Sequence, residues 1–199
     1  MSLELIAAKT DLRRQMRDCI ELMSAPDLEA ATDRLIHRLK AGPLSEIAPG
    51  MTVALFGGIQ GEPDLTTLIP WLTEKGVSPV LFGLGRGGLV AQVVTTSSSL
   101  SRGPFGVWIP QEDCPPLALA HLDIILVPGL AFDRHGGRLG RGRGYFDRLF
   151  ATPEVRAQRI GICFEDQLVE TVPVEPHDAR MQMIVTDRSQ VIVQPPSRS

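Results

Sequence analysis

The sequence predicts a single three-layer α/β/α domain with a mainly parallel sheet. Short apolar runs alternate along the chain with segments of helical periodicity, which is the order of elements found in α/β proteins. One run, residues 123–127 (DIILV), is continuously apolar after its initial aspartate, as expected of a strand that is covered on both faces. With 199 residues, 43% of them hydrophobic, the chain has the size of one domain with its own core. We therefore expect one domain over residues 1–199, of which residues 194–199 form a frayed tail.

Two amphipathic helices are predicted first. Apolar side chains recur at three- and four-residue intervals over residues 12–23 and again over residues 28–39. Ser24 followed by Asp27 is a capping signature for the second helix, and Gly42-Pro43 is expected to end it.

The next elements are short. Residues 51–56 form an apolar run that ends at two glycines, which predicts a buried strand. Asp64 is placed to cap a third helix that continues to Leu72, and Pro70 should shorten or kink this helix. A short helix is expected over residues 145–150. The remaining pattern predicts strands over residues 77–82, 89–95, 159–164 and 181–186, and a polar loop over residues 97–102.

Composition excludes several classes of function. The formal net charge of −3 argues against a general nucleic-acid or membrane-surface binder, which would be basic. Cys19, Cys114 and Cys163 lie far apart without a C-x-x-C pair, and the four histidines show no ligand spacing, so neither a disulfide framework nor a zinc site is expected. Residues 1–9 lack the basic region of a signal peptide, and no stretch approaches the roughly twenty apolar residues of a membrane span. We expect a cytoplasmic protein with no nucleic-acid or membrane partner.

A glycine-rich motif in the first half of the chain resembles a nucleotide-binding loop. Residues 83–88 satisfy G-x-G-x-x-G after a predicted strand, but that fingerprint requires a helix to begin there. The following residues, 89–95, are rich in β-branched side chains and lack helical period. We interpret the motif as a hairpin turn, with a nucleotide loop as the alternative.

The segment after the DIILV strand is the candidate site. It leaves the carboxyl end of a buried strand, where open α/β sheets bind their ligands. Residues 133–148 contain five arginines against two aspartates, and glycines at 140, 142 and 144 let backbone N–H groups approach an anion. One arginine can donate two parallel hydrogen bonds to a phosphate group. Asp147, just beyond the glycines, is a candidate magnesium ligand. The segment predicts a phosphate site; a flexible basic surface loop and a disordered RNA-binding segment are the alternatives.

The run PGLAFDRHGGRLGRGRGYFDRL, residues 128–149, resembles the hallmark of the 5-formyltetrahydrofolate cyclo-ligase family, also called methenyltetrahydrofolate synthetase. The N-terminal run Lys9-Thr10-Asp11-Leu12-Arg13 is similar to the K-x-x-L-R of that family, and Glu62-Pro63-Asp64 is similar to its E-x-D/E-T stretch. The closing pattern of the family is matched by Gln167, Pro173, Glu175, His177, Asp178 and Thr186.

The resemblance implies an ATP- and Mg²⁺-dependent enzyme that converts 5-formyltetrahydrofolate to 5,10-methenyltetrahydrofolate. In that reaction ATP phosphorylates the formyl oxygen, nitrogen 10 attacks the activated carbon, and phosphate leaves. Catalysis by the protein would consist mainly of positioning and charge neutralisation. The expected partners are ATP and a reduced folate, and the expected state is a monomer.

The resemblance also implies roles for individual residues. The ATP-binding set is Lys9, Arg13, Arg138, Gly140, Arg141, Gly142, Arg143, Gly144, Tyr145 and Phe146. The catalytic candidates are Arg143, next to the transferred phosphoryl group, with Arg141 and Tyr145. The substrate-binding candidates are Glu62 at the pterin, Trp108 and Tyr145, and the magnesium ligands are Asp147 and Asp178.

Each of these residues has a structural alternative. Lys9 and Arg13, one helical turn apart, can form a solvated helix face. Asp147 can be a capping carboxylate, Asp178 a turn residue, and Trp108 a core residue.

The sequence departs from the pattern of the family in a few places. Phe146 replaces the second tyrosine of G-Y-Y-D, Gln182 stands where an acidic residue is common, Phe82 replaces a frequent proline, and the turn around Gly88 lacks a common methionine. These departures leave a non-catalytic folate- or nucleotide-binding paralogue as the alternative function.

Overall fold

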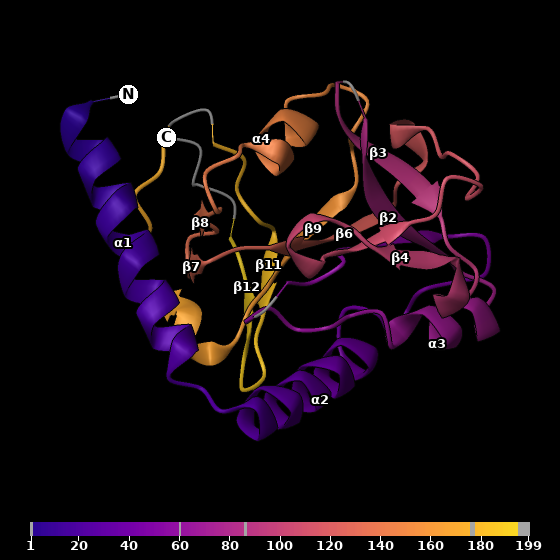
Figure 1. Ribbon diagram of the computed structural model, residues 1–199, viewed down its shortest axis with the longest axis horizontal. Coiled ribbons are helices and arrows are strands. Elements are labelled where there is room, and N and C mark those ends of the chain that lie inside the picture. The colour runs from indigo at the N-terminus through magenta and orange to yellow at the C-terminus, as the bar shows by residue number, and fades with distance from the viewer. Residues whose placement is uncertain (1, 60, 86, 176–177, 195–199) are drawn as a thin grey trace.

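The computed structural model describes residues 2–59, 61–85, 87–175 and 178–194. Its centre is a seven-stranded sheet of β1 (Thr52–Leu55), β2 (Ser78–Gly85), β3 (Gly88–Val93), β6 (Ile124–Pro128), β9 (Gln158–Ile162), β11 (Met183–Val185) and β12 (Gln190–Ile192). The strand order is β12-β11-β9-β6-β1-β2-β3 (Figure 1). The four inner pairs are parallel, and the two pairs at the edges are antiparallel. The prediction of an α/β fold with a mainly parallel sheet is confirmed.

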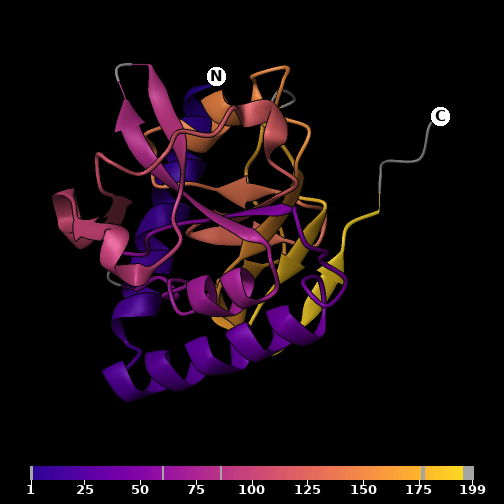
Figure 2. The same cartoon turned by 90° about the vertical axis from the view of Figure 1, so that its right-hand side faces the viewer.

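Helices cover both faces of this sheet. Helices α2 (Ala25–Ala41) and α3 (Leu68–Glu74) lie on one face of the sheet, as Figures 1 and 2 show. Their apolar side chains belong to the same core cluster as those of the inner strands. On the other face the short helix α4 (Tyr145–Phe150) contributes Leu149 to a second apolar cluster. Strand β6 supplies both clusters, Ile124 and Leu126 to the first and Ile125 and Val127 to the second. Its side chains are therefore covered on both sides, as its uninterrupted apolar run predicts.

The first helix, α1 (Leu3–Glu21), stands at one end of the molecule beside a small second sheet (Figure 1). That sheet has the order β10-β7-β8 and consists of β7 (Ala131–Asp133), β8 (Arg138–Leu139) and β10 (Leu168–Val169). Leu12 and Met16 of α1 pack against Ala131 and Leu139. The segment that the sequence presents as a glycine-rich loop is thus partly a sheet, and it is joined to the N-terminal helix.

The helix predictions hold at α2 and α4, whereas α1 begins nine residues before the predicted apolar period and ends at Glu21, two residues short of Met23. Ser24 caps α2 as predicted, since its hydroxyl accepts a hydrogen bond from the Asp27 N–H at 3.3 Å. The prediction that Asp64 caps the third helix is wrong, because that helix begins four residues later and follows Thr67. The Asp64 carboxylate instead accepts hydrogen bonds from the N–H and the hydroxyl of Thr66, which closes a turn. Pro70 is tolerated as the third helical residue because first-turn N–H groups have no intrahelical partner.

Of two predicted connections, the turn over residues 83–88 is confirmed and the loop over residues 97–102 is partly wrong. The glycine motif over residues 83–88 is a hairpin turn as interpreted, since β2 and β3 pair antiparallel up to Gly85 and Gly88. The polar loop predicted over residues 97–102 is wrong in its second half, where β4 (Leu100–Arg102) pairs with β5 (Trp108–Pro110) because Leu100 is buried.

Short 3₁₀ turns cover Ser97–Ser99, Pro104–Gly106, Leu119–His121 and Glu165–Gln167. Among the helices of the described ranges, none has the length and apolarity needed to cross a bilayer.

Candidate functional site

A buried carboxylate fixes the first turn of the 128–148 segment. Asp133 is 2% exposed, and its Oδ1 accepts hydrogen bonds from the backbone N–H groups of His135 at 2.8 Å and Gly137 at 2.9 Å. Its Oδ2 accepts a third from Val172 at 2.8 Å. Hydrogen bonds to an ionised acceptor are the strong ones. Asp133 therefore holds the β7–β8 turn and ties it to the chain beyond β10.

Gln167 holds the start of the same segment. It is 2% exposed, and its Nε2 donates to the carbonyl groups of Gly129 at 3.2 Å and Leu130 at 3.1 Å. Its Oε1 accepts from the Phe164 N–H at 2.9 Å. All polar atoms of this amide are engaged with backbone, so Gln167 positions the exit from β6.

Two cations of α1 reach the segment from the side. The ammonium of Lys9 lies 2.9 Å from Asp178 Oδ2 and 3.7 Å from Glu175 Oε2. The Arg13 Nε donates to the carbonyl of Gly140 at 3.0 Å. Burial first, and then the nearby charge of Arg17, lower the pKa of Arg13, while Asp147 acts in the opposite direction. The guanidinium stays charged near neutral pH because its ordinary pKa is so high.

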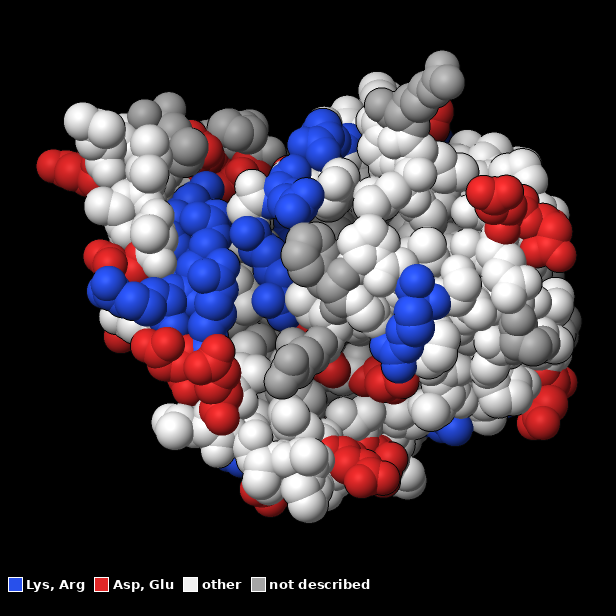
Figure 3. Space-filling view, in the orientation of Figure 1, with Lys and Arg blue, Asp and Glu red and all other residues white. Residues whose placement is uncertain are grey.

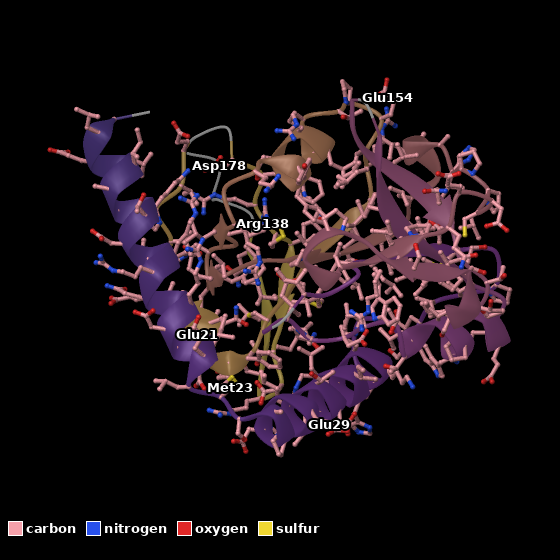
Figure 4. All side chains as sticks on the ribbon, in the orientation of Figure 1. Glu21, Met23, Glu29, Arg138, Glu154 and Asp178 are labelled. Carbon is pink, nitrogen blue, oxygen red and sulfur yellow. The ribbon has the colours of Figure 1, made fainter. Side chains whose placement is uncertain are left out.

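These groups surround a hollow of about 260 Å³. It is lined by Lys9, Arg13, Arg138, Leu139, Gly140, Gly142, Gly144, Asp147, Glu175 and Asp178. Figure 4 shows Arg138 and Asp178 beside the middle and upper part of α1, and Figure 3 shows basic side chains gathered on this face. A larger hollow of about 620 Å³ lies between α2 and the β11–β12 turn, and none of the predicted site residues lines it.

Arg138 and Asp147 pair across the hollow. Arg138 Nη2 lies 2.5 Å from Asp147 Oδ1, and Nη1 donates to the Pro128 carbonyl at 3.2 Å. The guanidinium also lies 5.7 Å from the centroid of the Phe146 ring. Phe146 in turn meets the edge of Phe82 at 5.9 Å between ring centroids. Two of the residues that depart from the pattern of the family are therefore in contact with each other.

The glycine-arginine turn follows. Gly142 and Gly144 have φ values of +99° and +65°, a region that favours glycine, so this turn depends on them. Arg141 Nε donates to Glu62 Oε1 at 2.8 Å, and Glu62 Oε2 accepts from the Ile59 N–H at 3.2 Å. This pair joins the turn to the loop after β1, the neighbour of β6 in the sheet.

The structure brings most of the predicted residues together, but to different degrees. Arg141, Arg143, Tyr145 and Phe146 lie on the same turn and helix without lining the hollow. Arg143 is exposed, and its carbonyl accepts a hydrogen bond from Arg148 Nη1 at 3.0 Å.

Trp108 is a predicted site residue, whereas Gln182 and His177 are named only as positions of the family pattern. Trp108 lies apart in β5, where its backbone N–H donates to the Gly57 carbonyl at 3.0 Å and its half-buried ring packs on the core. Gln182 does not line the hollow; its Oε1 accepts from the Arg159 N–H at 2.8 Å. His177 lies outside the described residues.

Leu139 and Glu175 line the hollow, although the sequence predicts no site role for either. Glu175 could have been found from its spacing, since it precedes Asp178 by three residues. The Glu175 N–H donates to Asp178 Oδ2 at 2.8 Å, so the turn role considered for Asp178 is present together with its ion pair to Lys9. Leu139 gives no comparable signal, because its side chain is buried and only the fold brings it to the hollow.

The fold and the site define an α/β protein with a cation-lined hollow beside the carboxyl ends of its central strands. Residues 5–187 match the 5-formyltetrahydrofolate cyclo-ligase family, and the chain belongs to that family.

Similar proteins agree with this assignment. The 5-formyltetrahydrofolate cyclo-ligase of Mycolicibacterium smegmatis is 32% identical, over 72% of this chain and 77% of that protein. The mouse protein of the same name is 36% identical, over 92% of this chain and 95% of its own. The solution structure of Aquifex aeolicus 5,10-methenyltetrahydrofolate synthetase superposes with a TM-score of 0.80 at 27% identity, over 96% of this chain and 95% of that one.

Proposed function

We propose that this protein closes 5-formyltetrahydrofolate to 5,10-methenyltetrahydrofolate with consumption of ATP. The γ-phosphoryl group passes to the formyl oxygen and ADP leaves; nitrogen 10 then attacks the activated carbon, and the carbon–oxygen bond breaks to release phosphate. The observation that carries the proposal is the convergence of Lys9, Arg13 and Arg138 on one hollow, in a chain that belongs to the cyclo-ligase family.

The hollow would hold the phosphate chain of ATP. Its cations come from two separate parts of the chain, α1 and the segment after β6, so they are positioned by the fold and not by one flexible loop. A triphosphate requires several charge-assisted hydrogen bonds, which Arg13 and Arg138 can supply through guanidinium groups. Gly140, Gly142 and Gly144 add no side chain that would obstruct the anion.

Arg143, Arg141 and Tyr145 would act at the transferred group. Arg141 and Arg143 lie on the turn that borders the hollow, and Tyr145 is the first residue of α4. An arginine near the transferred phosphoryl group stabilises charge that develops in the transition state, and it needs no change of protonation. Phe146 would contribute by packing, since its ring lies against Arg138.

The donor set at the hollow fits magnesium when phosphate oxygens complete the coordination. In the part of the chain that the structure describes, no group of three or more His, Cys, Asp or Glu side chains could hold a metal ion. Asp147 and Asp178 both line the hollow, and each is paired with a cation. Mg²⁺ needs only one or two carboxylates besides phosphates and water. Bound there, it would neutralise phosphate charge.

The folate would lie toward the carboxyl end of β1. Glu62 is 10% exposed and accepts two hydrogen bonds, so its position is fixed before a ligand arrives. The Glu62 carboxylate would accept a hydrogen bond from the pterin. Trp108, whose backbone contacts Gly57, and Tyr145 would form walls of the folate pocket. We further propose that the chain acts as a single-domain monomer in the cytoplasm.

The test is the appearance of the methenyl-folate absorbance band. Purified protein is mixed with 5-formyltetrahydrofolate and magnesium, with and without ATP. An ATP-dependent rise supports the proposal. If the protein binds ATP or folate tightly but no absorbance appears, it is a non-catalytic paralogue. Phe82 and Phe146 are then the first residues to replace, by the proline and the tyrosine that are common at these positions in the family.

A further inference from the structure

Three cations recur at four-residue intervals along α1: Lys9, Arg13 and Arg17. Positions four apart on an α-helix differ by about 40° in direction and about 6 Å along the axis. Arg17 therefore follows the other two along one side of the helix. Lys9 contacts Asp178 and Arg13 contacts Gly140, so the first two cations both face the site. Arg17 is the third cation of this row, and the proposed mechanism does not use it.

The turn of α1 beyond Arg17 is also in contact with a site loop. Ile20 is 9% exposed and lies so close to Gly61 that a Cβ atom there would come within 2.5 Å of its Cγ2. Gly61 immediately precedes Glu62, which pairs with Arg141. Arg17 is thus placed between two anchored points of the helix, one at the glycine turn and one at the loop that carries Glu62.

The charge of Arg17 has no direct partner among the described residues. It makes no hydrogen bond or ion pair within those ranges, and Glu21, one turn further on, forms no ion pair with it there. It is nevertheless near enough to Arg13 to lower the pKa of that residue, after the larger effect of burial. Arg14, three residues before it, differs because it forms an ion pair with Asp11 at 2.9 Å.

We propose that Arg17 is a further substrate-binding residue, which binds an anionic group that lies along α1 beyond Arg13. The inference rests on the proposed function. Two groups have this chemistry, the glutamate carboxylates of the reduced folate and the phosphates of ATP. Arg17 is not among the residues that line the hollow proposed for the phosphates, which favours the carboxylates, the other anionic end of the substrates.

The test compares Arg17→Gln with Arg14→Gln, which removes the same charge from the same helix. KM and kcat are measured by methenyl absorbance for ATP and for 5-formyltetrahydrofolate with one and with three glutamates. Arg17→Gln should raise KM for the folate roughly two- to fivefold, as expected for one exposed charge contact, and should change kcat less than about twofold. The effect should grow with the number of glutamates, and Arg17→Lys should restore most of the affinity. Arg14→Gln should match the wild type.

The possible results distinguish the two anionic groups, and they distinguish a failure of this inference from a failure of the proposed function. A raised KM for ATP alone would support the anion-binding role and assign it to the phosphates. Equal KM values for Arg17→Gln and Arg14→Gln with both substrates would overturn the inference while the wild type still turns over. A fall in kcat at unchanged KM would overturn it as well, since binding would not be the property lost. A wild type without turnover would overturn the proposed function itself.

Discussion

Arg138 and Asp147 form an ion pair of 2.5 Å in which the cation is almost buried and the carboxylate is not. The side chain of Arg138 is 5% exposed, whereas that of Asp147 is 46% exposed. The carbonyl of Pro128 and the ring of Phe146 also hold the guanidinium, so it keeps its place without the carboxylate. Asp147 is therefore the partner that can turn toward a ligand.

Asp147→Asn should raise the magnesium concentration needed for half-maximal turnover several-fold, because an amide is a poorer ligand than a carboxylate for this ion. The fold should remain, with a loss of no more than about 1 kcal/mol, since asparagine keeps an acceptor for Arg138. Magnesium titrations of turnover and thermal unfolding check both points. Unchanged metal dependence would mean that Asp147 is structural.

Arg143→Ala should lower kcat by more than about 100-fold, the scale of losing one preorganised electrostatic contact to the transition state. Because Arg143 is exposed, the variant should unfold at the wild-type temperature. Arg134→Ala, an exposed arginine of the same segment outside the hollow, is the matched control and should keep wild-type turnover. Near-normal turnover of Arg143→Ala would remove Arg143 from the mechanism.

Glu62→Gln should raise KM for the folate about tenfold or more, since a hydrogen bond to a charged acceptor contributes about 1.5 kcal/mol. KM for ATP should stay within about twofold, because Glu62 does not line the hollow. Glu74→Gln, an exposed carboxylate at the end of α3, is the control. If Glu62→Gln weakened ATP and folate alike, its role would instead be to hold Arg141.

Cys163 should stay a protonated, unreactive thiol in the folded protein. Burial first, and then the carboxylates of Glu165 and Asp187, raise its pKa well above the ordinary value of 9.0. Above pH 9 the unfolded chain releases this proton and the folded chain does not, so the free energy of unfolding falls as pH rises. Denaturant unfolding at pH 8 and pH 10 should show a larger fall for the wild type than for Cys163→Ala. Equal falls would contradict the predicted shift.

The sequence predicts elements whose signal is local and periodic. Helix α4 begins and ends at the predicted residues 145 and 150, and the buried strands lie within one to three residues of their predicted positions. The prediction that Asp64 caps α3 is wrong because an aspartate that closes a turn and one that caps a helix have the same local sequence. Strands β7 and β8 have three and two residues, too few for any period to appear.

Site residues were predictable only where a motif holds them together. The glycine-arginine run is contiguous, so its concentration of charge was visible from the sequence. The pair of Lys9 with Asp178 joins positions 169 apart, and no local pattern could connect them; only the resemblance to the cyclo-ligase family places both residues at one site. The contact of Phe82 with Phe146 was equally hidden, because it depends on how β2 and α4 pack.

If the hollow acts as proposed, ATP cleavage and ring closure are coupled. The most direct measurement follows methenyl absorbance and ADP in the same reaction of the wild-type protein. With this coupling, methenyl absorbance and ADP both depend on the two substrates together and appear in a one-to-one ratio. Methenyl product without ADP, or ADP release that does not require the folate, would contradict it.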